Sequence, residues 1–245
     1  MSVTAINKTA LVTGAARRIG RAIALDLAAH GWRVAIHYRS SRKEALNAVE
    51  TIRAAGGMAT AIAADLADVE QVRALIGRCA EELGPPTCLI NNASEFLLDT
   101  IASLTPGDWD THLDINLKAP VFLSQALYLA LPEGAEGNVI NICDQRVWRL
   151  TPQFFSYTIS KAGLWTATQT LAQAMAPRVR VNAIGPGPVL RSVHQTEQDF
   201  ATEATATILR RGATLEEIAA AVRFILATPS MTGQMIALDG GQHLS

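Results

Sequence analysis

ALVTGAARRIG, residues 10–20, is a short apolar run that leads through a glycine turn into a helical pattern. Gly14 permits the tight turn, and Gly20 lets the helix and the strand approach each other closely. The first turn of a helix presents unpaired N–H groups and the positive end of the helix dipole, a combination that binds phosphate. An ordinary turn between a strand and a helix is the alternative. We expect a nucleotide here, with its phosphates near Gly14, Arg17, Arg18 and Ile19.

The order of strand, turn and helix recurs along the whole chain. Short apolar runs predict strands at residues 10–12, 33–37, 61–64, 88–90, 138–142, 180–184 and 235–238. Helical spacing predicts helices that end at Gly31 and Gly56, and a helix over 69–83 capped by Asp68. Strands that alternate with helices pair in parallel, in a sheet covered on both faces. We therefore expect one α/β domain over residues 1–245, with a doubly wound parallel sheet of about seven strands.

The composition excludes several classes of protein. The chain has 21 basic and 22 acidic side chains, a net charge of −1 and 49% hydrophobic residues. This balance offers no basic surface for nucleic acid, and no apolar run is long enough to cross a membrane. The N-terminus lacks the pattern of a signal peptide, and the cysteines lack the spacing of a disulfide framework or a metal site. We expect a cytoplasmic protein that binds no metal, nucleic acid or membrane, with reduced thiols at Cys79, Cys88 and Cys143.

The end of the second predicted strand indicates which nucleotide binds. An acidic residue at this place accepts a hydrogen bond from the ribose 2′-hydroxyl and selects NAD. This chain instead has His37, Tyr38, Arg39 and Ser40, with Arg17 in the nearby turn. Arginine pairs with phosphate in a forked geometry, and serine can complete the contact. The segment predicts NADPH/NADP⁺, with a solvated loop arginine as the alternative.

Two further strand ends lie at the same predicted edge. Asp65 and Leu66 follow the third strand, where they can meet the adenine, although an aspartate there is also a common turn residue. Asn92, Ala93 and Ser94 follow the fourth strand, where side-chain amides can brace the backbone beside the cofactor. Each signal alone is weak, and their common position is what favours cofactor contacts.

A tyrosine and a lysine carry the chemistry. Tyr157 and Lys161 are spaced i and i+4, which places them on one face of a helix over 156–175. We expect the ammonium group to lower the pKa of the phenol, so that Tyr157 donates a proton near neutral pH. A surface tyrosine near an unrelated lysine is the alternative.

These pieces together resemble the short-chain dehydrogenase/reductase family along nearly the whole chain. The similar segments are residues 13–20, Asp65, 91–93, Asn116 within 114–117, Tyr157 with Lys161, 185–187 and 239–241. The resemblance implies a Rossmann-type fold, a nicotinamide cofactor and hydride transfer, with Tyr157 as proton donor. It also implies that Lys161 holds the nicotinamide ribose, that Asn116 organises a water chain behind Lys161, and that the cofactor site includes Pro186 and Gly187.

Two positions depart from the family pattern. The family usually has glycine at the position of Arg18, and serine at the position of Asp144, 13 residues before Tyr157. That serine donates a hydrogen bond to a substrate carbonyl. An ionised aspartate cannot donate, and it repels a developing alkoxide. The protein is therefore either a damaged carbonyl reductase or an enzyme whose substrate requires a carboxyl group.

A reduced pterin fits the second alternative, because its ring N–H and amino groups are donors. The pteridine reductase branch of the family is similar to this chain at Arg17-Arg18, at residues 37–40, at residues 92–96, and in its Asp/Tyr/Lys set. That resemblance implies that Arg18 faces pyrophosphate and pterin, that Ser94 bonds to the cofactor or ligand, and that Phe96 stacks on the ring. A plain core aromatic is the alternative for Phe96. Glu95 and residues 190–211 match nothing that we can assign.

Three functions remain open. The first is an NADPH-dependent pteridine reductase that acts on dihydropterin or dihydrofolate-like rings, with Asp144, Tyr157 and Lys161 at its centre. The second is a reductase of another carbonyl or imine, and the third is a non-catalytic NADP(H)-sensing module. The family resemblance and the apolar residues of the helix over 156–175 also favour a homotetramer, with a fully buried internal helix as the alternative; these residues are Leu164, Trp165, Leu171 and Met175.

Overall fold

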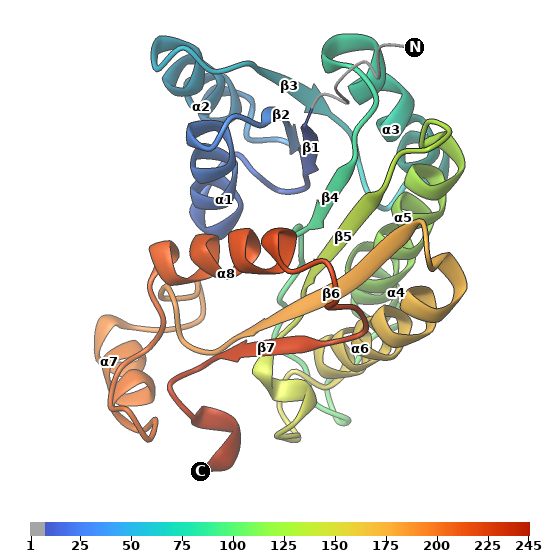
Figure 1. Cartoon of the computed structure of the whole chain (residues 1–245). Coiled ribbons are helices and arrows are strands. Elements are labelled where there is room, and N and C mark those ends of the chain that lie inside the picture. Colours follow the sequence, from blue (N-terminus) through green and yellow to red (C-terminus); the bar gives the residue numbers. More distant parts are fainter. Residues whose placement is uncertain (1–7) are drawn as a thin grey trace.

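The alternation of strands and helices places all seven strands in one sheet (Figure 1). The computed structural model describes residues 8–245. Within them every neighbouring pair of strands is parallel, in the order β3-β2-β1-β4-β5-β6-β7. The strands are β1 (Thr9–Val12), β2 (Arg33–Tyr38), β3 (Ala59–Ala63), β4 (Cys88–Asn91), β5 (Gly137–Ile142), β6 (Val179–Pro186) and β7 (Met235–Leu238). The predicted doubly wound sheet is confirmed.

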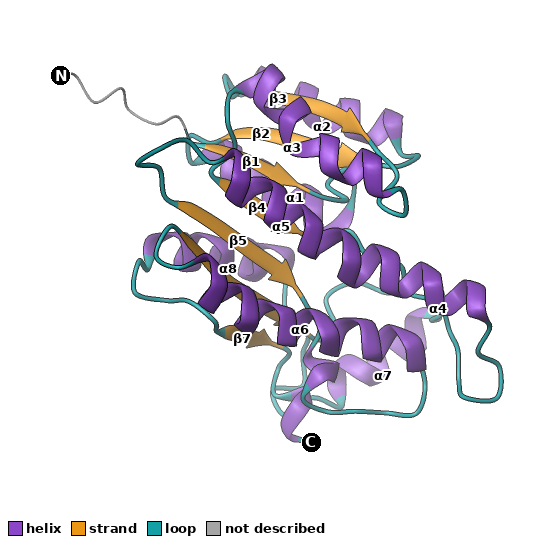
Figure 2. Ribbon diagram, turned by 90° about the vertical axis from the view of Figure 1, so that its right-hand side faces the viewer, coloured by secondary structure: helices purple, strands orange, loops and turns teal. Residues whose placement is uncertain are grey.

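Helices cover both faces of this sheet. The faces are distinguished by strand periodicity: Ala10 and Val12 pack with α1, α2 and α8, whereas Leu11 packs with α3, α5 and α6. Figure 2 shows α3, α5 and α6 lying across the second face. The helices are α1 (Arg18–Ala29), α2 (Arg42–Ala54), α3 (Val69–Leu83), α4 (Pro106–Leu113), α5 (Ala119–Ala130), α6 (Phe155–Met175), α7 (Glu197–Thr205) and α8 (Leu215–Ala227). Three short segments complete the fold: a π-helical turn (Asp114–Lys118) and two 3-10 turns (Gln145–Val147 and Gln242–Leu244).

The predicted helix ends agree with the structure. Gly31 and Gly56 have φ angles of 81° and 83°, in the left-handed region that glycine adopts without strain. Asp68 caps α3, because its side chain accepts hydrogen bonds from the N–H groups of Glu70 and Gln71. Several strand boundaries differ by one or two residues: β3 starts at Ala59 and not at residue 61, and β6 extends to Pro186 and not only to residue 184. The edge strand β3 begins with the small residues of ATAIA, of which only Ala59 and Ile62 are buried, so its start carries little apolar signal.

Among the described residues, no helix has the length and hydropathy that a membrane span requires. The same residues contain no group of three or more His, Cys, Asp or Glu side chains placed to hold a metal ion.

Candidate active site

The carboxyl ends of the strands open into two adjoining cavities. The first, of about 350 Å³, lies over β1, β2 and β4, and the second, of about 500 Å³, lies beyond β5 and β6. Arg18, Ile19, Asn92 and Ser94 line both, so the two cavities share these residues as a common wall. Every residue predicted for the site lines one of them except Asn116, which is buried behind the wall. The first cavity holds Gly14, Arg17, His37, Tyr38, Arg39, Ser40, Asp65, Leu66 and Ala93, and the second holds Phe96, Asp144, Tyr157, Lys161, Pro186 and Gly187.

The turn after β1 has no room for side chains at its glycines. Gly14 has a φ of 61°, and a Cβ there would lie 2.9 Å from Ala93 Cα. A Cβ at Gly20 would lie 2.5 Å from the Asn92 amide nitrogen, which donates to Thr13 O (2.8 Å). The first hydrogen bond of α1 runs from Arg21 N–H to Arg17 O (3.2 Å), so the preceding N–H groups point out of the helix. This cradle fits a pyrophosphate.

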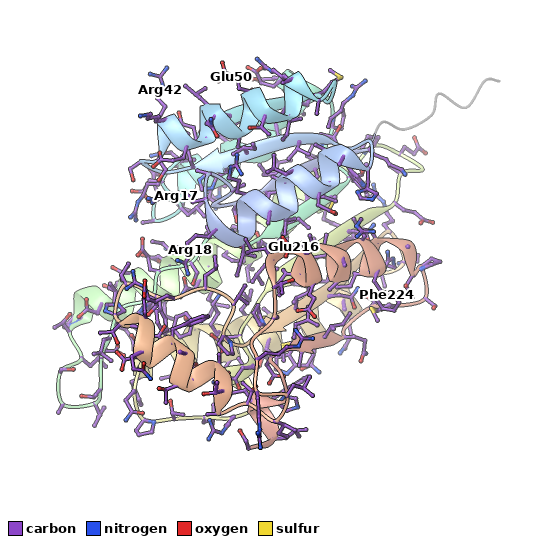
Figure 3. All side chains as sticks on the ribbon, turned by 90° about the vertical axis from the view of Figure 1, so that its left-hand side faces the viewer. Arg17, Arg18, Arg42, Glu50, Glu216 and Phe224 are labelled. Carbon is purple, nitrogen blue, oxygen red and sulfur yellow. The ribbon has the colours of Figure 1, made fainter. Side chains whose placement is uncertain are left out.

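Arg18 adopts a backbone conformation that favours glycine. Its φ is 54°, which strains any residue with a side chain. Its guanidinium donates to Arg191 O (2.9 Å) and Leu190 O (3.1 Å) in the segment between β6 and α7. Burial and the neighbouring arginines lower the pKa of Arg18. Figure 3 shows Arg17 on the side of α2 and Arg18 on the side of α7.

The buried His37 ring holds the turn after β1 in place through a hydrogen bond to Gly14. The side chain is 2% exposed, its Nδ1 accepts from Gly14 N–H (3.0 Å), and its Nε2 lies 3.1 Å from Ala64 O. These contacts require a neutral ring with the proton on Nε2, which donates to the carbonyl. Burial lowers the pKa of His37 to about 4, so the neutral ring persists across the physiological range.

Charged side chains line the rim of the first cavity. Arg39 forms an ion pair with Glu95 (2.8 Å), and Arg17 lies 3.9 Å from Glu44 on α2. Asp65 accepts a hydrogen bond from Ala67 N–H (3.0 Å) and so closes the turn before α3. Arg39, the predicted phosphate ligand, therefore already has a carboxylate partner.

Asn116 braces the wall between the cavities. It lies in the π-helical turn between α4 and α5, a local distortion that is frequent at functional sites. Its Oδ1 accepts from Glu95 N–H (2.9 Å) and Ser94 Oγ (3.1 Å), and its Nδ2 donates to Glu95 O and to Ser160 Oγ (both 3.0 Å). Asn116 thus connects the loop after β4 with the helix that carries Tyr157 and Lys161.

Asp144, Tyr157 and Lys161 meet at the floor of the second cavity. Tyr157 OH donates to Asp144 Oδ2 (2.7 Å), and the other carboxylate oxygen accepts from Arg146 N–H (2.8 Å). Lys161 Nζ donates to Ile142 O (2.8 Å) and lies 5.7 Å from the centre of the Tyr157 ring. The helical spacing has placed Tyr157 and Lys161 on one face, as predicted.

The electrostatics of this group differ from the expectation. Burial and the Asp144 carboxylate raise the pKa of Tyr157, burial raises the pKa of Asp144, and burial lowers the pKa of Lys161. The prediction that Lys161 lowers the pKa of the phenol is wrong in this structure, because the charge bonded to the phenol is the Asp144 carboxylate. Tyr157 and Asp144 therefore hold protons tightly and titrate as a coupled pair.

Aromatic rings form one wall of the second cavity. The Phe96 ring stacks on Phe154 (centroids 4.2 Å apart) and contacts Tyr157 edge-on (4.6 Å). The Arg146 guanidinium lies 5.3 Å from the centre of the Phe154 ring, and its buried Nε has no hydrogen-bond partner among the described residues. The wall thus offers a flat apolar surface next to a carboxylate and an arginine.

Sequence reasoning missed a buried chain beneath Tyr157. Leu97 N–H donates to His112 Nε2 (3.0 Å), His112 Nδ1 lies 2.7 Å from Ser156 Oγ, and Ser156 Oγ donates to Asp99. The histidine, serine and aspartate are at most 1% exposed. The chain ties the Phe96 loop to the start of α6, and the position of Ser156 directly before Tyr157 was its one signal in the sequence.

Comparison with known proteins agrees with this geometry. The family model described as Enoyl-(Acyl carrier protein) reductase matches residues 14–243. The chain is 50% identical to the solved structure of FolM alternative dihydrofolate reductase 1 from Brucella suis in complex with NADP, with a TM-score of 0.95 over 98% of this chain and 96% of that one. A short-chain dehydrogenase from Burkholderia cenocepacia in complex with NADP is 34% identical, with a TM-score of 0.89 over 96% and 97% of the two chains.

A second group of relatives has a different name. The 3-oxoacyl-[acyl-carrier-protein] reductase FabG of Staphylococcus aureus is 32% identical over 98% of this chain and 99% of its own length. The NADP complexes among the solved structures agree with the expected cofactor. With its fold, its Tyr157/Lys161 pair and its family match in agreement, the chain is an oxidoreductase of the short-chain dehydrogenase/reductase family.

Proposed function

We propose that this protein is an NADPH-dependent reductase of dihydropterin or dihydrofolate-like rings. The observation that carries the proposal is the hydrogen bond of 2.7 Å between Tyr157 OH and Asp144 Oδ2, at the place where a carbonyl reductase has a serine donor. A carboxylate there suits a substrate edge that donates hydrogen bonds, as the N–H and amino groups of a pterin do.

The first cavity fits the cofactor. The glycine cradle and the first turn of α1 would hold the pyrophosphate, with Arg17, Arg18 and Ile19 around it, and Arg39 and Ser40 would hold the 2′-phosphate. Tyr38, Asp65, Leu66 and Ala93 would surround the adenosine, and His37 would keep the turn in shape. Lys161, Pro186 and Gly187 would line the nicotinamide end, where NADPH supplies a hydride when it is bound.

The residues of the second cavity would manage the proton. Reduction of a C=N bond adds a hydride to carbon and a proton to nitrogen, and the coupled Tyr157–Asp144 pair holds a proton at the cavity floor. Phe96 would stack on the pterin, and Ser94 and Arg18, which line both cavities, would contact ligand and cofactor. Asn116 would hold the loop after β4 in place against α6, because it bonds to both Glu95 and Ser160.

Two alternatives remain. The relatives named FabG favour a carbonyl substrate, but Asp144 stands where such a reductase has a serine donor, and its carboxyl group accepts the hydrogen bond of Tyr157 OH. A sensing module has no need of the Tyr157–Lys161 pair. The chain's 50% identity to an alternative dihydrofolate reductase supports the pterin reading over both.

The direct test follows NADPH oxidation with three substrate types: dihydrobiopterin, dihydrofolate and a 3-oxoacyl thioester. We expect turnover of at least one pterin and little of the thioester. Turnover of the thioester alone would select the carbonyl reductase, and turnover of none with tight NADPH binding would select the sensor.

We also propose a homotetramer, on the family resemblance. The helix α6 supports it less than expected, because of the four apolar residues named for it Leu164 and Met175 pack inside the protomer, whereas Trp165 and Leu171 are partly exposed. Light scattering at micromolar concentration tests it, and a monomer there would contradict it.

A further inference from the structure

Glu95, which the sequence left without a role, contacts the residue proposed to bind the 2′-phosphate. Its Oε1 lies 2.8 Å from Arg39 Nη1, and the two side chains are 26% and 53% exposed. Arg39 follows β2 and Glu95 follows β4, and β1 runs between these strands. Both side chains line the first cavity, so the ion pair reaches across its mouth.

The backbone of Glu95 is held in place. Asn116 bonds to its N–H (2.9 Å) and to its carbonyl oxygen (3.0 Å), and Asn116 is itself bonded to Ser160 on α6. An exposed ion pair between two free side chains contributes little. Here the Glu95 side chain extends from a backbone that Asn116 holds in place, so its carboxylate stays beside Arg39.

This carboxylate changes what Arg39 offers to a cofactor. A phosphate monoester carries close to two negative charges at neutral pH, so it must share the guanidinium with Glu95 and is repelled by it. A free ribose carries no charge, and its 2′-hydroxyl can donate a hydrogen bond to a carboxylate. The Glu95 carboxylate therefore weakens the binding of NADP(H), which carries the 2′-phosphate, and does not weaken the binding of NAD(H).

We infer that Glu95 is a specificity-determining residue that lowers the preference for NADP(H) over NAD(H) by competing with the 2′-phosphate for Arg39. The inference rests on the proposed placement of that phosphate at Arg39. It concerns cofactor binding alone, and so it is independent of which substrate is reduced.

The test measures dissociation constants of NADP⁺ and NAD⁺ by titration calorimetry. In Glu95→Gln, which keeps the backbone contacts to Asn116, we expect NADP⁺ to bind about fivefold to tenfold more tightly, and NAD⁺ to change less than about twofold. Glu44→Gln is the matched control, since it removes a carboxylate beside Arg17, which lines the same cavity, without releasing Arg39. Its effect on either cofactor should stay below about twofold.

A double-mutant cycle decides between explanations. If Glu95 acts through Arg39, the gain for NADP⁺ disappears when Glu95→Gln is made in an Arg39→Ala background. Weaker NADP⁺ binding in Glu95→Gln would overturn the inference, because Glu95 would then hold Arg39 in the position that binds the phosphate. An equal gain in affinity for both cofactors would also overturn it. Glu95→Asp retains the charge and should resemble the parent. If Arg39→Ala alone leaves NADP⁺ binding unchanged, the proposed phosphate placement fails, and the inference fails with it.

Discussion

The two cavities are built in different ways although they share one wall. The first offers a ligand mainly backbone groups: a turn without space for side chains and free N–H groups at the start of α1, with half-exposed arginines at its edge. The second is built from buried ionisable side chains that bond to one another, with Asp144 between Tyr157 and the N–H of Arg146. Under the proposed function, binding at the first cavity would depend on local geometry, and chemistry at the second would depend on the proton affinities that burial creates.

The largest effect should come from the second cavity. Tyr157→Phe removes the proposed proton donor and the hydrogen bond to Asp144, so reductase activity should fall by roughly 10³-fold. NADP⁺ affinity should stay within about twofold of the parent, because the first cavity is untouched. Steady-state rates and calorimetry on one preparation check both statements. A variant that keeps its activity would show that another group donates the proton.

The next effect concerns the free energy of unfolding of the protein, to which His37 in the first cavity contributes. The pKa of His37 is about 4 in the folded protein and near 6.5 in an unfolded chain, so the unfolded state binds more protons between these values. The stability from its neutral ring is therefore complete above pH 6.5 and is lost as the pH falls through 4, a loss of roughly 3 kcal/mol.

Urea unfolding at several pH values measures this loss. His37→Gln, which does not titrate, should be less stable than the parent at pH 7 and should lose less stability on acidification. Equal slopes in the parent and in His37→Gln would refute the assignment.

Asp144→Ser separates the two enzymatic readings. The change leaves a hydroxyl in place of the acid, so reduction of dihydropterin should fall by roughly 10²-fold. The new donor can bind a ketone oxygen, and turnover of a 3-oxoacyl thioester should rise. Unchanged pterin turnover in this variant would remove the carboxylate from the mechanism, even though the family assignment would stand.

The first cavity and the sheet were largely predictable from the sequence because their signals are local. Gly14 and Gly20 lie six residues apart, Asp68 caps the helix that follows it, and the strands are continuous apolar runs. The helices between β4 and β5 were not identified. There α4 and α5 join through the π-helical turn, which interrupts the helical period.

The second cavity was predictable only in its residue types. Asp144, Tyr157 and Lys161 could be named, but which groups touch depends on how β5 and α6 pack. In the structure the pKa of the Tyr157 phenol is therefore raised, whereas the sequence predicted that it is lowered. Contacts between residues far apart in the chain could not be predicted for the same reason. Arg39 and Glu95 form such a pair, as do His112 and Ser156, and no sequence pattern links the two members of either pair.

The smallest expected effect concerns the first cavity and tests whether the proposed contact of Arg39 with the 2′-phosphate matters beside the backbone cradle. Arg39→Ala should raise the KM for NADPH by about tenfold and leave that for NADH within about twofold, because only NADPH carries the 2′-phosphate. The effect is smaller than for a free arginine, since Glu95 already neutralises part of the charge of Arg39. Steady-state kinetics with both cofactors measure the ratio, and added salt should shrink it because the side chain is half exposed. An equal loss for both cofactors would place Arg39 on the adenine or the ribose and leave phosphate recognition to Arg17 and Ser40.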